Sequence, residues 1–204
     1  MSSKVSGTGS FACQLAKNVF KTGKVITTVS TSKVSRVPEL LGKGVVDQII
    51  DYTKASPHAA IPARSVDFCL DTTGQAMSFL SLMVPNTSLI ISISTTPSGT
   101  QLQEADLMDR PGRPQLSVLA RAFLNAADAV RRARAWRWGV EYSYFFLESN
   151  VEDLDAVSQY VEEGKVKRVV GTRVQPRNLE EVRGAAGQVY EGKGGIGKAV
   201  ILVK

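Results

Sequence analysis

The chain has 204 residues, of which 43% are hydrophobic and 22% are charged, so it can bury a sizeable core and is too apolar to be disordered. Its 25 Lys and Arg against 19 Asp and Glu give a net charge of +6, compatible with nucleic acid, a phosphate-bearing ligand or solubility alone. One histidine and two cysteines exclude a multi-histidine zinc site and a disulfide framework.

Hydrophobic spacing and turn residues predict helices and strands that alternate along the chain. The predicted helices span 11–20, 34–41, 76–83, 117–137, 151–163 and 178–191. The predicted strands span 24–29, 47–52, 66–71, 89–94, 141–147 and 200–203, and residues 54–65 and 95–115 are predicted loops. This alternation predicts an α/β fold, a doubly wound parallel sheet of about six strands in one domain, residues 1–204.

The first predicted helix opens with Ser6-Gly7-Thr8-Gly9-Ser10, and backbone amides at a helix start hold anionic oxygen well. A dinucleotide fingerprint reads G-x-G-x-x-G after a strand, whereas positions 4–9 read K-V-S-G-T-G, with only the last glycine in register. The pattern alone leaves an ordinary glycine-rich helix start as an equal alternative.

The stretch after the predicted strand 24–29 reads Ser30-Thr31-Ser32-Lys33, with no acid before Glu39. Sites for the unphosphorylated dinucleotide place Asp or Glu there, on the ribose hydroxyls. Hydroxyls and a lysine instead accept a 2′-phosphate, so the stretch favours NADPH over NADH. A solvated basic turn is the alternative.

Ordered sequence blocks carry a family resemblance: SGTGSFACQLAK, KVITTVSTSKV, QIIDYTK, DFCLDTTG, LIISIST, EYSYFFLES, EEGKVKRVVGTRV and GKGGIGKAVILV. They resemble the medium-chain dehydrogenase/reductase superfamily, in its zinc-free quinone and enoyl reductase branch with fungal zinc-binding-dehydrogenase-like proteins. The resemblance implies a Rossmann-like fold, NADPH, no metal and a small-molecule substrate. The family's N-terminal GroES-like domain has no counterpart here. We therefore expect a sheet missing its first strand, no separate catalytic domain and no catalytic residue that can be named.

Carried onto matching positions, the resemblance implies a set of cofactor-binding residues. Those on the pyrophosphate, the 2′-phosphate and the adenosine are Gly7, Thr8, Gly9, Ser10, Ser30, Lys33 and Tyr52. Those on the ribose and nicotinamide side are Thr73, Gly74, Ser94, Thr95, Phe145, Phe146 and Leu147. Lys4 and Ser6 replace family glycines, where a side chain obstructs close approach of phosphate.

The sequence therefore predicts an NADPH-dependent oxidoreductase of the quinone or enoyl reductase type, or a truncated remnant of one. The alternative is a non-redox protein on the same scaffold, a cyclase-like or accessory binding module that no longer uses the cofactor. A third interpretation is a gene whose real start lies upstream.

The expected partner is a second copy, paired through the edge of the aromatic strand Glu141–Leu147. The arginines at 131, 132, 134 and 137, with Trp136 and Trp138, are interpreted as a solvated helix end, which predicts no nucleic-acid partner and no membrane contact. No apolar run is long enough to span a membrane and the first ten residues lack an apolar signal core, so a cytoplasmic location is expected.

Overall fold

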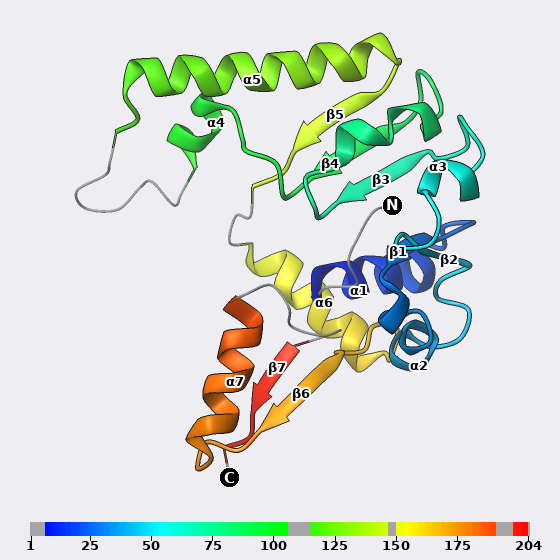
Figure 1. The fold of residues 1–204 in the computed structure, drawn as a ribbon, viewed down its shortest axis with the longest axis vertical. Helices are drawn as coiled ribbons and strands as arrows, with labels where there is room; N and C mark the ends of the chain where they lie inside the picture. The colour runs from blue at the N-terminus through cyan, green and yellow to red at the C-terminus, as the bar shows by residue number, and fades with distance from the viewer. Residues whose placement is uncertain (1–6, 106–114, 147–149, 191–197, 204) are drawn as a thin grey trace. The chain divides into compact units, whose positions relative to one another are not determined.

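The structure is a computed structural model that describes residues 7–105, 115–146, 150–190 and 198–203 (Figure 1). Its contacts divide the chain into two compact units. The terminal unit joins Ser3–Ala55 to Val151–Lys204, and the middle unit is Ser56–Asn150.

The terminal unit begins with helix α1 (Gly7–Gln14), which continues into a π-helical turn at Leu15–Val19. The helix predicted at 11–20 is therefore confirmed, and it starts at the glycines themselves. Lys17 closes its end, because its Nζ donates to the Gly23 carbonyl and pairs with Asp47, both at 2.9 Å. The Val25 amide also donates to Asp47 at 2.7 Å, and this bond together with Lys17 lowers the pKa of the Asp47 carboxyl.

Two short parallel strands follow α1. β1 (Ile26–Val29) pairs with β2 (Gln48–Asp51), with Val29 opposite Asp51. A 3₁₀ turn (Thr31–Lys33) and helix α2 (Arg36–Leu41) connect them. The β-branched residues of β1 are buried at three of four positions, as expected for a strand covered on both faces.

The carboxyl-terminal part of this unit holds a second parallel strand pair. Its elements are α6 (Val151–Glu162), β6 (Val170–Val174), α7 (Leu179–Tyr190) and β7 (Lys198–Ile201). Asn178 caps the start of α7, since its Oδ1 accepts the Glu181 amide at 3.3 Å. β6 was not predicted, because Gly171 and Arg173 interrupt its apolar pattern.

The middle unit is built on a three-stranded parallel sheet in the order β3–β4–β5. The strands are β3 (Phe68–Asp71), β4 (Leu89–Ser92) and β5 (Glu141–Tyr144). Helix α5 (Val118–Arg137) runs along the sheet and packs on β5, with α4 (Gly99–Glu104) against its first half (Figure 1). Ile90, Ala135 and Cys69 lie in the core.

Two sequence predictions for the middle unit need correction. The helix predicted at 76–83 is a pair of 3₁₀ turns, Ala76–Ser78 and Leu80–Leu82. Their backbone bonds join residues three apart, from Phe79 to Ala76 and from Met83 to Leu80, and the carbonyls of Ser81 and Leu82 accept amides from residues 64–66. The loops predicted at 54–65 and 95–115 contain the short helices α3 (Pro57–Ala60) and α4.

All strand pairings among the described residues are parallel, which confirms the α/β class. The strands that the structure describes form three hydrogen-bonded sheets rather than one, and β6 adds a strand to those predicted.

Candidate functional site

The glycine-rich start of α1 is the first predicted part of the site. Gly9 and Ser10 are buried, and the Ser10 hydroxyl donates to the Gly7 carbonyl at 2.7 Å, inside the first turn. Thr8 is exposed and Gly7 half-exposed, so these two residues present the helix start to solvent. A helix start of this kind carries partial positive charge and suits an anionic oxygen.

A cation that sequence reasoning did not single out lies beside this helix start. A Cβ built on Gly7 would be 3.9 Å from two side-chain carbons of Lys198, which leaves ordinary contact room. The Lys198 ammonium lies 5.9 Å from the ring centre of Phe11. The lysine comes from β7, at the far end of the sequence, so no local pattern around Gly7 could have indicated it.

The carboxyl ends of β1 and β2 bring Ser30, Lys33 and Tyr52 to one edge of the terminal unit. Ser30 precedes the 3₁₀ turn that contains Lys33, and Tyr52 follows β2, where its amide donates to the Val29 carbonyl at 3.1 Å. Ligands of parallel sheets bind at this edge. The placement therefore agrees with a shared site for these three residues, whose contacts to a cofactor stay a prediction.

Asp51 ends β2 at the same edge, and the sequence analysis overlooked its carboxylate. Thr31 donates to Asp51 Oδ2 at 2.7 Å, while the Thr53 hydroxyl and amide donate to Oδ1 at 2.6 and 3.0 Å. These bonds, that of the Thr53 hydroxyl foremost, lower the pKa of Asp51. The acid is therefore held by two threonines, with the Lys54 ammonium at 3.9 Å.

In the middle unit, Thr73, Gly74, Ser94 and Thr95 lie at the carboxyl ends of β3 and β4. Asp71, which is fully buried at the end of β3, organises the first loop. Its Oδ1 accepts the amides of Thr73 and Gln75 at 2.9 and 3.2 Å, and its Oδ2 accepts the amide of Ala76 at 3.1 Å. Gly74 has a φ of 76°, a conformation that glycine adopts without strain.

The second loop is tied to the first through Ser92, which is also fully buried. The Ser92 hydroxyl donates to Asp71 Oδ2 at 3.0 Å and accepts the Thr95 amide at 3.2 Å and the Thr95 hydroxyl at 3.1 Å. The Thr95 hydroxyl also lies 2.6 Å from the Tyr142 hydroxyl of β5. The structure thus joins Thr73, Ser94 and Thr95 in one hydrogen-bond network, through three residues that sequence reasoning did not select: Asp71, Ser92 and Tyr142.

Phe145 and Phe146 follow β5, which ends at Tyr144, whereas the sequence predicts them inside the strand. They line a hollow of about 270 Å³ with Gln101, Glu104, Ala105 and Tyr144, and the rings of Tyr144 and Phe146 meet edge to face at 5.3 Å between centres. Leu147 lies outside the described residues. The hollow offers aromatic walls with two polar side chains, which suits a flat ring.

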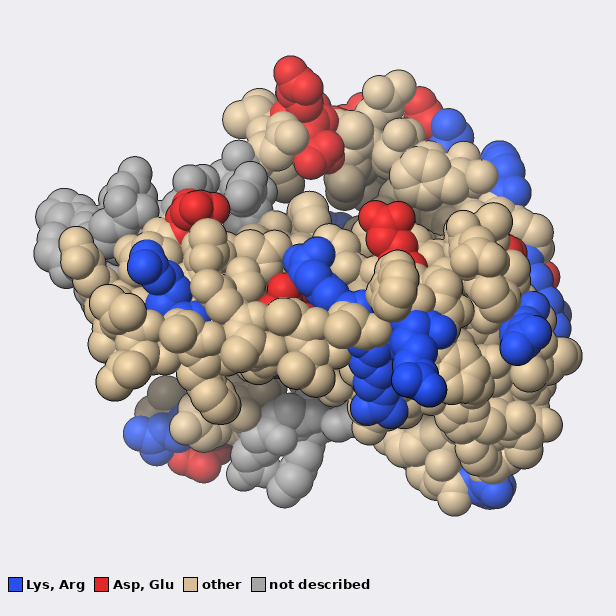
Figure 2. Space-filling view, turned by 90° about the horizontal axis from the view of Figure 1, so that it is seen from above, with Lys and Arg blue, Asp and Glu red and all other residues tan. Residues whose placement is uncertain are grey.

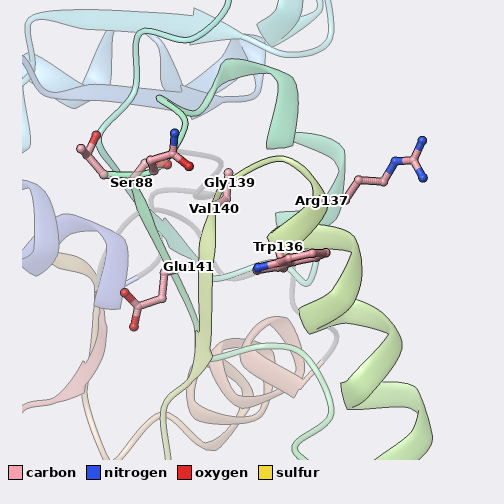
Figure 3. Close-up of a pocket in the computed structure, with 8 residues that line it drawn as sticks. Ser88, Trp136, Arg137, Gly139, Val140 and Glu141 are labelled. Carbon is pink, nitrogen blue, oxygen red and sulfur yellow. The ribbon is translucent and has the colours of Figure 1, made fainter.

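A larger hollow, about 580 Å³, lies at the amino ends of β4 and β5 (Figure 3). The Trp136 ring and the Glu141 carboxylate border it, whereas the Arg137 side chain points away from Ser88 and Glu141. Cofactors of parallel sheets bind at the opposite, carboxyl edge, so this hollow is separate from the predicted site.

Figure 2 looks onto α5, where Lys and Arg atoms gather toward the end of the helix. Asp128 holds two of the arginines there, with Arg132 Nε at 2.6 Å and Arg131 Nη1 at 4.0 Å. Arg131 also donates to the Thr96 carbonyl at 2.7 Å. These contacts agree with the interpretation of a solvated helix end, and the expected absence of a nucleic-acid partner stays a prediction.

Neither cysteine offers a reactive group. Both are buried free thiols, and burial raises the pKa of Cys13 to about 11 despite its hydrogen bond to Thr27. At neutral pH the Cys13 thiol is therefore protonated and a poor nucleophile.

Over the described ranges, no group of three or more His, Cys, Asp or Glu side chains could hold a metal ion. In the same part of the chain, no helix is both long and apolar enough to cross a bilayer.

Comparison with known proteins identifies the family. The family model described as zinc-binding dehydrogenase matches residues 45–201. The chain belongs to the zinc-binding dehydrogenase family. This confirms the resemblance inferred from the ordered sequence blocks, while the metal implied by the family's name finds no fitting ligand set among the described residues. A search of curated proteins finds no match.

Solved structures share the fold of this zinc-binding dehydrogenase chain at low sequence identity. They include the quinone oxidoreductase from Coxiella burnetii (22% identity, TM-score 0.68). The match covers the whole of this chain and 51% of the Coxiella chain. The match to CurA from Vibrio vulnificus in complex with NADPH (17% identity, TM-score 0.61) covers the whole of this chain and 56% of the CurA chain. The match to a short chain alcohol dehydrogenase from E. coli CFT073 complexed with NADH (10% identity, TM-score 0.61) covers 99% of this chain and 51% of the dehydrogenase chain. The chain thus spans about half the length of these structures.

Proposed function

We propose that this chain forms the coenzyme-binding part of an NADPH-dependent reductase of the quinone or enoyl type, acting on a small molecule. Membership of the zinc-binding dehydrogenase family supports an oxidoreductase. The similar structures include a quinone oxidoreductase and a protein solved with NADPH. One similar structure was solved with NADH, so the choice of coenzyme rests on the residues of this chain.

The edge formed by β1 and β2 is the observation that carries the choice of NADPH. Ser30 and Lys33 stand after β1, where a site for the unphosphorylated dinucleotide has a carboxylate. Asp51 of β2 shares that edge, but it is hydrogen-bonded by Thr31 and Thr53. A lysine with hydroxyl groups favours the 2′-phosphate, and the oxygens of Asp51 already accept the threonine donors instead of being open to ribose hydroxyls.

The start of α1 fits the pyrophosphate of such a coenzyme, because Thr8 is exposed and Gly7 half-exposed there and Lys198 adds a positive charge beside Gly7. NADPH, when bound, supplies the hydride. The role proposed for the terminal unit is to hold the phosphates at the start of α1. The role proposed for the middle unit is to orient the nicotinamide through the loops after β3, β4 and β5. We assign no residue to proton transfer.

Replacing Lys33 with Glu tests this proposal. The variant is expected to bind NADPH at least about tenfold more weakly, because it places a carboxylate beside the 2′-phosphate, while NADH binding changes by less than about twofold. Titration of the purified chain, followed by nicotinamide fluorescence, measures both affinities.

Lys43→Glu makes the same charge change at an exposed loop position and is expected to leave both affinities unchanged. If the unaltered chain takes up neither nucleotide, the proposed function is wrong. If Lys33→Glu weakens NADPH and NADH equally, the 2′-phosphate assignment is wrong.

We also propose a homodimer formed through the Glu141–Leu147 strand. β5 pairs with β4 on one side, and the structure shows no strand partner on its other side among the described residues. An open strand edge with aromatic side chains can pair with a second copy. Light scattering is expected to give twice the chain mass. Tyr144→Pro in β5 removes an amide donor from the open edge, because the amides of Glu141 and Phe145 on either side of it in the alternation face β4, and it is expected to give the single mass. A monomer in the unaltered protein would contradict the proposal.

A further inference from the structure

We infer that Asp71 and Tyr142 are positioning residues of the coenzyme site, as the two ends of a chain of hydroxyl groups that fixes the Ser94–Thr95 turn. The inference deepens the proposed function and rests on it for the identity of the ligand. Neither residue belongs to the predicted site, and neither is placed to contact the coenzyme itself.

The direction of every hydrogen bond in this series of hydroxyl groups follows from the buried Asp71 carboxyl group at its start. The Asp71 carboxyl group accepts amides on both of its oxygens, and the Ser92 hydroxyl donates its one proton to Oδ2. Ser92 must then accept from Thr95, which donates its own single proton to Ser92 Oγ. Tyr142 must in turn donate to Thr95, across the 2.6 Å between their oxygens.

The same chain holds the backbone of the turn. Besides the Thr95 hydroxyl, the Ser92 oxygen accepts the Thr95 amide at 3.2 Å, and the Ser94 amide shares this second acceptor position at the longer distance of 3.4 Å. The neighbouring loop abuts this turn, because a Cβ on Gly74 would lie 3.6 Å from the Ser94 carbonyl oxygen. The orientation of both loops therefore depends on the carboxylate of Asp71.

Burial makes this network strong and specific. Asp71 and Ser92 are fully buried and Tyr142 is 4% exposed, so water does not compete for these bonds. The three groups come from three adjacent strands, so this series of hydrogen bonds crosses the carboxyl edge of the whole middle sheet.

The network also fixes what the turn can recognise. Thr95 has given its proton to Ser92 and accepts one from Tyr142, so its remaining lone pair can only accept. A ribose hydroxyl or a carboxamide N–H satisfies that requirement, whereas an anionic or carbonyl oxygen does not. Ser94 is exposed and presents the second hydroxyl of the turn.

The first test measures the turn without any ligand. In Tyr142→Phe, which keeps the ring and removes the donor to Thr95, the Ser94 and Thr95 amides are expected to exchange with deuterium about fivefold faster than in the unaltered chain. In Ser92→Ala the increase is expected to exceed about tenfold. Tyr190→Phe, on a side chain that is 93% exposed, serves as the control and is expected to change neither rate. Unchanged exchange in Tyr142→Phe overturns the inference.

The second test separates positioning from general stability. Tyr142→Phe is expected to weaken NADPH about fivefold and to leave 2′,5′-ADP, which lacks the nicotinamide half, unchanged. An equal loss for both ligands, or no loss for either, overturns the positioning role. Failure of the unaltered chain to bind either ligand refutes the proposed function instead, and amide exchange still decides whether the hydroxyl chain holds the turn.

Discussion

Gly99→Ala is expected to destabilise the middle unit by about 3 kcal/mol, the cost of forcing a methyl group into a filled contact. Gly99 begins α4, and a Cβ there would lie 2.6 Å from the carbonyl oxygen and 2.7 Å from the Cα of Arg121 in α5. These are backbone atoms of a 20-residue helix, which cannot rotate aside as a side chain would. The two helices must therefore separate.

Separation of the helices would also break the bonds that hold them together. The Thr100 amide donates to Asn125 Oδ1 at 3.0 Å, and the Asn125 amide group donates to the Thr100 hydroxyl at 3.1 Å. Urea unfolding followed by tryptophan fluorescence reports on this unit specifically, because both tryptophans of the chain, Trp136 and Trp138, belong to it.

Gly184→Ala is the matched control for this experiment. Gly184 lies within α7 of the terminal unit, where an added Cβ meets nothing within 4 Å, so the same change there is expected to leave the unfolding transition that the tryptophans report unchanged. Equal stability of Gly99→Ala and the unaltered chain would show that α4 does not pack on α5 as described.

The sequence predicts an element well where one local pattern decides it. The run Leu89–Ser92 is apolar and β-branched, and it is a strand at the centre of the middle sheet. Prediction failed where distant groups decide the conformation. The residues from 76 to 83 have a helical pattern, yet carbonyls at Ser81 and Leu82 bind amides of residues 64–66. A periodic pattern does not show these long-range bonds, which hold the segment where it forms two 3₁₀ turns.

The candidate site shows the same division. The loops after β1, β3 and β4 could be found from the sequence, because ligands of parallel sheets bind after the strands. The groups that hold those loops could not be found from the sequence. Asp71 and Tyr142 are 71 residues apart in the chain, and only the pairing of β3 and β5 with β4 brings them near each other. Lys198 reaches Gly7 from the last strand, and Asp51 is held by a threonine across a strand pair. Register and long-range packing set all of these contacts.

Gln14→Ala is expected to destabilise the terminal unit by about 3 kcal/mol, because it leaves buried polar groups without partners. The Gln14 side chain is 1% exposed and binds the backbone of Lys167 twice. Its Nε2 donates to the Lys167 carbonyl at 3.0 Å and its Oε1 accepts the Lys167 amide at 2.7 Å. This amide pair joins the proposed phosphate-binding helix α1 to a segment 153 residues later in the chain.

Hydrogen exchange followed by mass spectrometry measures this effect, and peptides covering α1 and residues 165–174 are expected to lose protection together. Gln159→Ala is the control, because Gln159 is exposed on α6 and donates only to Glu163, at 2.8 Å. Gln14→Glu is expected to be at least as harmful as Gln14→Ala, since its carboxylate would face the carbonyl oxygens of Ser10 and Lys167, which now accept from Nε2. Loss of protection in α1 alone would mean that the amide pair does not couple the two segments.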